Sequence, residues 1–250
     1  MPGLTRILAQ NLVHPDWRPI LEPALASVNR QYLESLMQDS RWLPGADRLL
    51  AAFRRNLDGV RYVLLGESPY PRPESANGIA FYDASVDGLW SPQGLSKAVN
   101  RATSLRNLLK TMLIAEGRIN KDADGKITQT AIADLNKEGM IQSLPELFAN
   151  LERAGLLMLN ATPVLHPLRK PNQEAVYWQP FVEAVLHGLA SRPITLILWG
   201  QIAAVIEKMP ASQSFNKLVC EHPYNISFID NPQMRSLFGD LRLLAQPNPI

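Results

Sequence analysis

The chain has 250 residues, of which 46% are hydrophobic and 19% charged, and its formal net charge is only +2. This composition is typical of a globular protein with a full hydrophobic core. No apolar run reaches the ~18 residues of a membrane-spanning helix, so we expect no membrane role. The small net charge neither indicates nor excludes binding of nucleic acid, because such binding requires only a local basic surface on the protein.

The N-terminal residues and the cysteine content bear on the compartment. The stretch MPGLTRILAQNLVHPDW lacks a long apolar core and a small-residue cleavage site, so we expect no secretory signal. The single cysteine, Cys220, can form no internal disulfide, which fits a reducing compartment. We therefore expect a cytoplasmic protein. The one cysteine and four histidines also lack zinc-site spacing, so we expect no metal.

Apolar runs alternate with segments of helical spacing along the chain. In chain order the sequence predicts helices within 1–55, a strand at 60–66 (VRYVLLG), helices at 94–115 and 145–153, a strand at 156–162 (LLMLNAT), a helix at 174–190, a strand at 194–200 (ITLILWG), a helix at 201–208, a strand at 217–223 (KLVCEHP) and a helix at 232–245. Such alternation predicts a three-layer α/β/α fold around a central four-stranded parallel sheet. We expect one domain over residues 1–250, with an N-terminal helical part at 1–55 and an insertion at 117–143.

Each predicted strand ends in a polar or proline-rich cluster: ESPYPRP, NATPVLHP, WGQ and HPYN. Any one cluster is ordinary turn chemistry, because proline and asparagine commonly follow strands. Ligands of open α/β folds bind at the carboxyl ends of strands, so four such clusters can converge on one crevice. The sequence therefore predicts a binding site at this edge of the sheet.

Ser68 follows a strand in GESPY, which is similar to the G-x-S-x-G nucleophile elbow of serine hydrolases. Tyr70 stands where the second glycine of that motif should be. The elbow also uses the backbone N–H of the residue after the serine as an oxyanion donor, and Pro69 has none. We therefore set serine-hydrolase chemistry aside.

The segment NKDADGKITQTA (120–131) is similar to a calcium-binding loop. Its first position is Asn120 rather than aspartate, and its twelfth is Ala131, where a bidentate glutamate should close the site. We instead expect a solvated turn with Gly125 in the left-handed conformation.

Several segments together resemble one family, the uracil-DNA glycosylases, and its family-1 branch most closely. GESPYPRPESANGIAF (66–81) aligns without a gap with the family's first motif, GQDPYHGPGQAHGLAF. The identical residues are Gly66, Pro69, Tyr70, Pro73, Ala76, Gly78, Ala80 and Phe81. Later segments follow in the family's order: ATSLRNLLK resembles PPSLLN, LLMLNAT resembles the strand of the uracil-reading asparagine, ILWG resembles LLWG, and HPYNIS resembles HPSPLS. The resemblance covers residues 45–245 and implies hydrolysis of the N-glycosidic bond of a flipped-out deoxyuridine in base-excision repair.

The resemblance also implies roles for individual residues. Phe81 would stack on the extruded uracil, and Asn160 would read its N3–H and O4 edge. Tyr70 would stand against C5, leaving no room for the methyl group of thymine. His222 would hydrogen-bond O2 as negative charge develops on the departing base. Ile226, in place of the family's leucine, would wedge into the hole left in the duplex. Each residue also has a purely structural interpretation, as core, turn former or satisfied histidine.

The implied partner is uracil-containing DNA, single- or double-stranded, bound by a monomer without a cofactor. Ser104 stands in place of the family's phosphate-gripping serine. The candidate DNA contacts are Arg101, Ser104, Arg106, His166, Arg169 and Lys170. A cluster of charges is more often a solvated surface, so this alternative stays open.

The chain departs from the family pattern at the residues expected to activate the attacking water. The family's water-activating aspartate is Ser68 here, its glutamine is Glu67, and the following histidine is Pro71. A serine hydroxyl does not ionise near pH 7, and loss of a general base costs on the order of 10²- to 10⁴-fold. Ser68 therefore predicts either an atypical, slower enzyme or a catalytically inactive member that binds DNA or a nucleobase-like ligand.

Two further alternatives follow from the same loop. Glu67, expected beside the base, could replace the missing carboxylate only if the loop turned adjacent side chains to one side. Arg72 and Asn77 also differ from the family at the loop rim, so a different modified base stays open as the substrate.

Overall fold

The computed structural model describes residues 7–247, which fall into two compact units. Unit 1 comprises the chain up to Ser85 together with Gly155–Val219, and unit 2 comprises Val86–Ala154 together with the chain from Cys220. Residues 1–6 of the expected N-terminal helical part lie outside the described residues. That the whole chain forms one domain stays a prediction.

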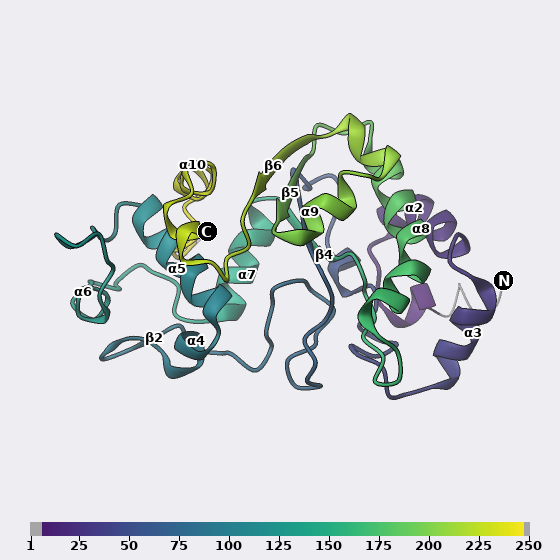
Figure 1. Cartoon of the computed structure of the whole chain (residues 1–250), viewed down its shortest axis with the longest axis horizontal. Coiled ribbons are helices and arrows are strands. Elements are labelled where there is room, and N and C mark those ends of the chain that lie inside the picture. The colour runs from purple at the N-terminus through teal and green to yellow at the C-terminus, as the bar shows by residue number, and fades with distance from the viewer. Residues whose placement is uncertain (1–6, 248–250) are drawn as a thin grey trace. The chain divides into compact units, whose positions relative to one another are not determined.

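The four-stranded sheet of unit 1 follows the four apolar runs (Figure 1). Its strands are β1 (Tyr62–Gly66), β4 (Leu156–Asn160), β5 (Thr195–Trp199) and β6 (Asn216–Cys220), in the order β4-β1-β5-β6. β1 pairs in parallel with both β4 and β5. Every residue of β4 is buried, as expected for a strand covered on both faces. The predicted α/β fold, a central four-stranded parallel sheet flanked by helices, is confirmed.

The helices of unit 1 include those expected in the first 55 residues. They are η1 (Pro15–Trp17), α2 (Arg18–Ala26), α3 (Arg30–Gln38), η2 (Ala51–Arg54), α8 (Pro171–Leu189), α9 (Gln201–Ile206) and η3 (Pro210–Ser214). α2 packs along α8. Gly188 makes this possible, because a Cβ there would lie only 2.8 Å from Cγ2 of Ile20. Trp17, Leu21 and Trp178 are fully buried in this core.

Unit 2 is mainly helical. It contains the hairpin of β2 (Trp90–Ser91) and β3 (Gly94–Leu95), and the helices α4 (Lys97–Arg101), α5 (Thr103–Ala115), α6 (Gln129–Ala133), α7 (Leu144–Arg153), η4 (Ile226–Asp230) and α10 (Pro232–Leu241). α5 packs against both η4 and α10. The helix predicted at 94–115 is two helices, because Ala102 has φ −90° and ψ 85° and interrupts the helical backbone.

The calcium-like segment is a turn held by the side chain of Asp122. The Asp122 carboxylate accepts hydrogen bonds from the backbone N–H groups of Asp124 and Lys126, at 3.1 and 2.7 Å. Gly125 has φ +74°, which confirms the expected left-handed glycine. That residues 117–143 are an insertion stays a prediction. Within residues 7–247, no helix is long and apolar enough to cross a membrane.

Candidate active site

The carboxyl end of β1 brings an aromatic ring and an amide together. Gly66 lies opposite Asn160 in the β1–β4 register. A Cβ on Gly66 would lie 3.2 Å from Oδ1 of Asn160 and 3.3 Å from Cε2 of Phe81. Any side chain at this position would therefore press on both groups, and the glycine lets them meet. Phe81 and Asn160, assigned to base recognition from sequence, are neighbours within unit 1.

Phe81 is held in an unusual backbone conformation. Its φ is +61°, in the left-handed region that bulky residues rarely adopt. Such strain persists only where the surroundings enforce it. The half-buried ring packs edge-on against Trp199 of β5, with centroids 5.1 Å apart and an interplanar angle of 65°. The ring is therefore fixed in place at the end of the sheet.

Asn160 is the last residue of β4 and places its carboxamide at the carboxyl end of the sheet. The residue is 8% exposed. The carboxamide lies at the carboxyl end of β4, beside Gly66 and Phe81, which is the edge of a parallel sheet where ligands of α/β folds bind.

Glu67 and Ser68 line one pocket of unit 1. The pocket has a volume of about 240 Å³ and lies between the loop after β1 and the first turns of α8 and α9. Its other lining residues are Ala161, Thr162, Pro171, Asn172, Ala175, Gln179, Gln201, Ile202, Val205 and Met209. The loop is anchored by a 2.9 Å hydrogen bond from the N–H of Thr162 to the carbonyl of Glu67. Glu67 and Ser68 thus border the same space, although they are adjacent in sequence.

Tyr70 and Asp83 belong to the loop that carries Phe81. The Tyr70 hydroxyl lies 3.5 Å from the Phe81 carbonyl. Burial, with a contribution from the nearby Asp83 carboxylate, raises the pKa of Tyr70 to about 12, so the phenol stays neutral. Asp83 is 4% exposed and its Oδ2 accepts a 2.9 Å hydrogen bond from Nη2 of Arg72. Sequence reasoning missed Asp83, and it counted Arg72 only as a departure from the family.

In unit 2, the segment from His222 to Asn225 forms a tight turn. The backbone N–H of Tyr224 donates to Nδ1 of His222 at 3.1 Å. Because a backbone N–H can only donate, Nδ1 accepts, and the proton of the neutral imidazole sits on Nε2. The N–H of Asn225 also bonds the carbonyl of His222, at 2.9 Å. The turn therefore presets His222 as a hydrogen-bond donor through Nε2.

Asn107, a residue missed from sequence, braces this turn. It lies on α5, is 3% exposed, and its Nδ2 donates to the carbonyl of Pro223 at 2.8 Å. The only sequence signal was an amide among the apolar positions of ATSLRNLLK. Ile226, at the start of η4, is 79% exposed. The interpretation of Ile226 as a core residue is therefore wrong.

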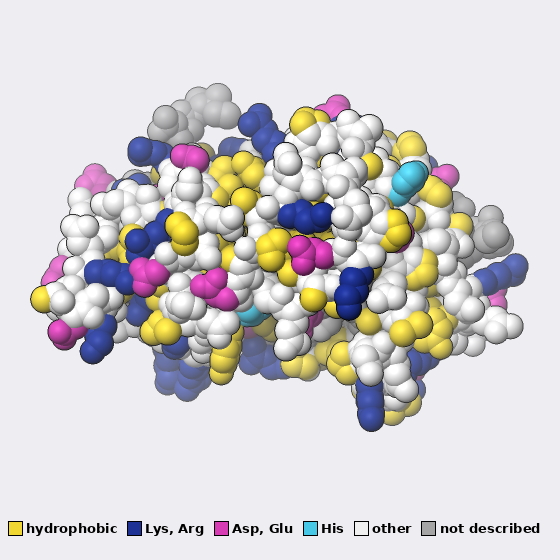
Figure 2. Space-filling model, turned by 45° about the horizontal axis from the view of Figure 1, so that its top comes forward, with side chains coloured by type: hydrophobic (Ala, Val, Ile, Leu, Met, Phe, Trp, Pro, Cys, Tyr) yellow, Lys and Arg dark blue, Asp and Glu magenta, His cyan; other side chains and the backbone are white. Residues whose placement is uncertain are grey.

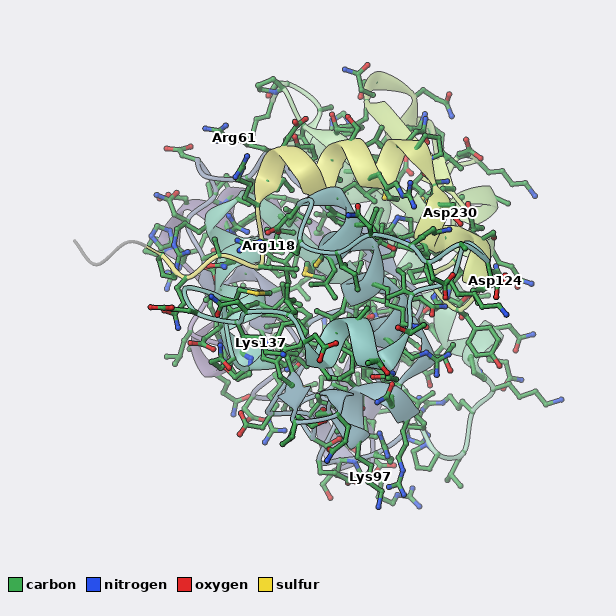
Figure 3. The ribbon with its side chains drawn as sticks, turned by 90° about the vertical axis from the view of Figure 1, so that its left-hand side faces the viewer. Arg61, Lys97, Arg118, Asp124, Lys137 and Asp230 are labelled. Atoms are coloured by element: carbon green, nitrogen blue, oxygen red, sulfur yellow. The ribbon has the colours of Figure 1, made fainter. Side chains whose placement is uncertain are left out.

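The start of α5 is an anion-compatible surface of unit 2. Ser104 lies in the first turn, and the N-cap residue Ala102 makes no side-chain cap, so the first N–H groups lack a side-chain partner within the described residues. Residues 97–110 hold no acidic residue and four cations, Lys97, Arg101, Arg106 and Lys110. Of these, Arg106 donates to the carbonyl of Asn100 at 2.9 Å and Lys110 to that of Ile127 at 3.1 Å. Lys97 extends outward from α4 in Figure 3. Basic and acidic side chains are otherwise interspersed on the face in Figure 2, in keeping with the small net charge.

His166 and Arg169 are engaged inside unit 1. His166 is 4% exposed, with its Nε2 3.1 Å from Oδ2 of Asp39. Arg169 donates through Nη1 to Oε1 of the fully buried Glu174 at 2.9 Å, and its guanidinium lies 5.3 Å from the ring centroid of Tyr32. These contacts anchor the segment before α8. His166 is buried by these contacts, whereas the Arg169 side chain keeps 29% of its surface exposed, so DNA contact by Arg169 stays a prediction.

The comparisons with known proteins agree with this fold. No family model matches the chain. The chain is 40% identical to a protein of solved structure, the UNG of Nitratifractor salsuginis, with a TM-score of 0.93 and 98% of each chain covered. The crystal structure of mimivirus uracil-DNA glycosylase shares the fold, with a TM-score of 0.57, 17% identity, and coverage of 89% of this chain and 72% of that one.

Curated relatives give the same result. The uracil-DNA glycosylase of Corynebacterium glutamicum is 24% identical over 78% of this chain and 74% of its own length. The uracil-DNA glycosylase of a Nocardioides species is 27% identical over 84% of this chain and 79% of its own length. The chain belongs to the uracil-DNA glycosylase family.

Proposed function

We propose that the protein is a uracil-DNA glycosylase that hydrolyses the N-glycosidic bond of a flipped-out deoxyuridine in base-excision repair. The observation that carries the proposal is the meeting of Gly66, Phe81 and Asn160 at the end of β1. A ring that can stack and an amide that can both donate and accept, side by side, are what recognition of an extruded pyrimidine requires. Membership of the family supports the same substrate class.

Base recognition uses three side chains of unit 1. Phe81 stacks on the uracil, and the Asn160 carboxamide accepts from N3–H and donates to O4. Cytosine presents an acceptor at N3 and an amino group at C4, so it matches this amide poorly in the same orientation. Tyr70, neutral because its pKa is raised to about 12, stands against C5 and excludes the thymine methyl group.

Bond cleavage uses His222 and a water molecule held by Ser68. The water oxygen bonds to C1′ of the sugar as the bond from C1′ to N1 breaks. The bonding electrons leave with the base as the uracil anion, and the surplus proton of the water passes to solvent. His222 donates through Nε2 to O2 and stabilises this charge, an effect typically of order 10²- to 10³-fold. The neutral Ser68 orients the water without removing its proton, and Glu67 borders the same pocket. The expected enzyme is therefore slow.

DNA is held by surfaces of unit 2. The first turn of α5, with Ser104, binds a phosphate, because helix N-termini favour anions. Arg101 and Arg106 add positive charge, and the exposed Ile226 enters the duplex where the base has left. A monomeric state and a cytoplasmic location remain part of this proposal.

Release of uracil from oligonucleotides tests the proposal. Single-stranded and duplex uracil-containing oligonucleotides are incubated with the protein and then treated with alkali, which breaks the strand at abasic sites. We expect cleavage in excess of a His222→Ala control on both substrates. Equal cleavage by the wild type and His222→Ala would reject the enzyme.

The neutral Ser68 favours a second candidate, a family member that binds DNA without cutting it. In that case uracil-containing DNA is bound more tightly than matched thymine-containing DNA, yet stays resistant to alkali. A third candidate, cleavage at a different modified base, predicts release from another lesion but not from uracil. An oligonucleotide panel with several lesions, scored for both binding and cleavage, separates the three.

A further inference from the structure

We propose that Tyr224 is a second base-contacting residue, which stacks on a DNA base beside the extruded nucleotide. The inference rests on the proposed function, because it takes single- or double-stranded DNA as the ligand. The residue lies in HPYNIS, between His222 and Ile226, at the position that is serine in the family motif HPSPLS. No role follows for it from that motif, since a serine cannot stack.

The first observation is where exposed apolar side chains occur. Tyr224 is 67% exposed and Ile226 is 79% exposed. Among the described residues of unit 2 they are the only exposed large hydrophobic side chains, and they lie two positions apart. Neighbouring exposed apolar groups mark a contact surface, whereas single scattered ones need no explanation.

The second observation is the rigidity of the backbone that carries them. The Asn107 amide reaches three successive carbonyls, those of Pro223, Tyr224 and Asn225, at 2.8, 3.4 and 3.4 Å. The N–H of Tyr224 is held by His222. A side chain presented from a fixed backbone loses little conformational entropy on binding. The fold thus holds an aromatic ring out into solvent, as a stacking platform requires.

The third observation is the charge beside this turn. α5 packs against η4, which begins at Ile226. Residues 97–110, in α4 and the first part of α5, include four cations and no acid, whereas the acids nearest to Tyr224 in the sequence are Glu221 and Asp230. A basic backbone-binding element next to exposed aromatic and aliphatic groups is the combination used to bind DNA strands.

Tyr224 and Ile226 then have different tasks. Ile226 fills the hole that an extruded base leaves in a duplex, so its effect is confined to double-stranded DNA. Tyr224 stacks on a base that remains in the strand, which is present in single-stranded DNA as well. Stacking is tolerant of sequence, because every base has a π face.

Binding of a fluorescent single-stranded oligothymidine, measured by anisotropy, tests the inference. A second oligonucleotide of equal length carries abasic residues in place of its central bases and so keeps the phosphates. We expect Tyr224→Ser to weaken oligothymidine binding by about 5- to 150-fold and to leave the abasic oligonucleotide unaffected. Tyr224→Phe keeps the ring and therefore keeps the affinity. Val176→Ser, which changes a 66% exposed residue of unit 1, is the matched control and changes neither.

Three results overturn the inference: no loss for Tyr224→Ser, an equal loss on both oligonucleotides, or an equal loss for Tyr224→Phe. A folding defect lowers binding of both oligonucleotides, so it also counts against stacking. The assay needs no cleavage and is therefore separate from the proposed function. If the wild type releases uracil while Tyr224→Ser binds normally, only the stacking inference fails. If Tyr224 governs binding but no uracil is released, only the glycosylase proposal fails.

Discussion

At the residue scale, the proposed base site depends on Gly66, which has no side chain. At Gly66 an added Cβ would lie 3.0 Å from Cβ of Ala80, besides its close approach to Asn160 and Phe81. None of these neighbours is the free end of a long side chain, so the ring and the amide must shift. Misplacement of reacting or binding groups by about 1 Å can cost on the order of 10²-fold in rate.

Gly66→Ala is therefore expected to lower the rate of uracil release by on the order of 10- to 100-fold. Single-turnover kinetics on a uracil-containing oligonucleotide measure this effect. Gly88→Ala is the control, because a Cβ at that position meets nothing within 4 Å. An active Gly66→Ala variant, equal to Gly88→Ala, would show that Phe81 and Asn160 do not recognise the base.

Tyr70 gives a pH prediction. A pKa raised to about 12 means that the neutral phenol persists throughout the neutral and mildly alkaline range. The ratio of the uracil-release rates of wild type and Tyr70→Phe should therefore be constant between pH 6 and about 10, since the phenol of a raised pKa ionises only above that range. A ratio that falls near pH 9 to 10 would place the ionisation of Tyr70 in that range and reject the buried, neutral role.

The roles of residues could be predicted from sequence where a family motif contains them. They could not be predicted where only the packing of the folded chain determines the role. The asparagine and the phenylalanine follow from the ordered motifs. Asn107 does not, because an amide within an amphipathic helix looks the same whether it faces solvent or a turn that lies 116 residues away along the chain. The ion pair of Arg169 was not predictable for a related reason, because a basic cluster in sequence does not reveal a buried carboxylate, such as Glu174, that pairs with it.

At the element scale, the loop from Tyr70 to Ser85 is closed by one buried carboxylate. Asp83 accepts hydrogen bonds from the backbone N–H and the hydroxyl of Ser85, at 3.0 and 2.6 Å, and pairs with Arg72. Burial raises its pKa, but the hydrogen bonds from Ser85 and Ser75 and the Arg72 charge outweigh burial and lower it overall. The ionised form is therefore the one that holds the loop.

Asp83→Asn is expected to lower the free energy of unfolding at pH 7 by about 1.5–3 kcal/mol, the usual value of a hydrogen bond to a charged group. A lowered pKa contributes stability above the unfolded-state pKa, and this contribution is lost as the pH falls through the folded-state pKa. The difference between wild type and Asp83→Asn should therefore shrink as the pH is lowered below about 4. Urea unfolding at a series of pH values measures it.

Asp58→Asn provides the control for this series. Its carboxylate is 75% exposed and pairs with Arg192, so its removal is expected to cost only about 0–1 kcal/mol. A difference for Asp83→Asn that is independent of pH, or no larger than that of Asp58→Asn, would contradict the bracing role.

The strands of the fold were predictable for a clear reason. VLLG, LLMLN and LILW are continuous apolar runs, and such runs fit only strands that are covered on both faces. The division of the 94–115 segment was not predictable, because Ala102 favours helix and nothing in its neighbourhood signals its extended ψ. The division of the chain into two units also has no local signal, since each unit takes residues from two distant stretches.

At the scale of the whole molecule, a net charge of +2 gives no long-range attraction to DNA. Affinity must then come from a few local phosphate contacts, and we expect a weak dependence on salt. Arg101→Gln should reduce the slope of log K against log salt concentration by about 1. Filter binding or anisotropy at several salt concentrations measures the slope.

Lys137→Gln is the control for that slope. Lys137 lies outside residues 97–110, and its ammonium donates to the carbonyls of Ala133 and Leu135, both at 3.0 Å. An equal change in slope for both variants would mean that residues 97–110 are not the phosphate-binding surface.

We propose that this chain is a uracil-DNA glycosylase in which Phe81 and Asn160 recognise the base and Ser68 stands at the water-activating position in place of aspartate. The most direct test is the uracil-release rate of Ser68→Asp relative to wild type, with Ser68→Asp combined with Asn160→Ala as the reference. We predict a gain on the order of 10²- to 10⁴-fold for Ser68→Asp that disappears when Asn160 is also replaced. No gain, or a gain that survives the loss of Asn160, would contradict the account.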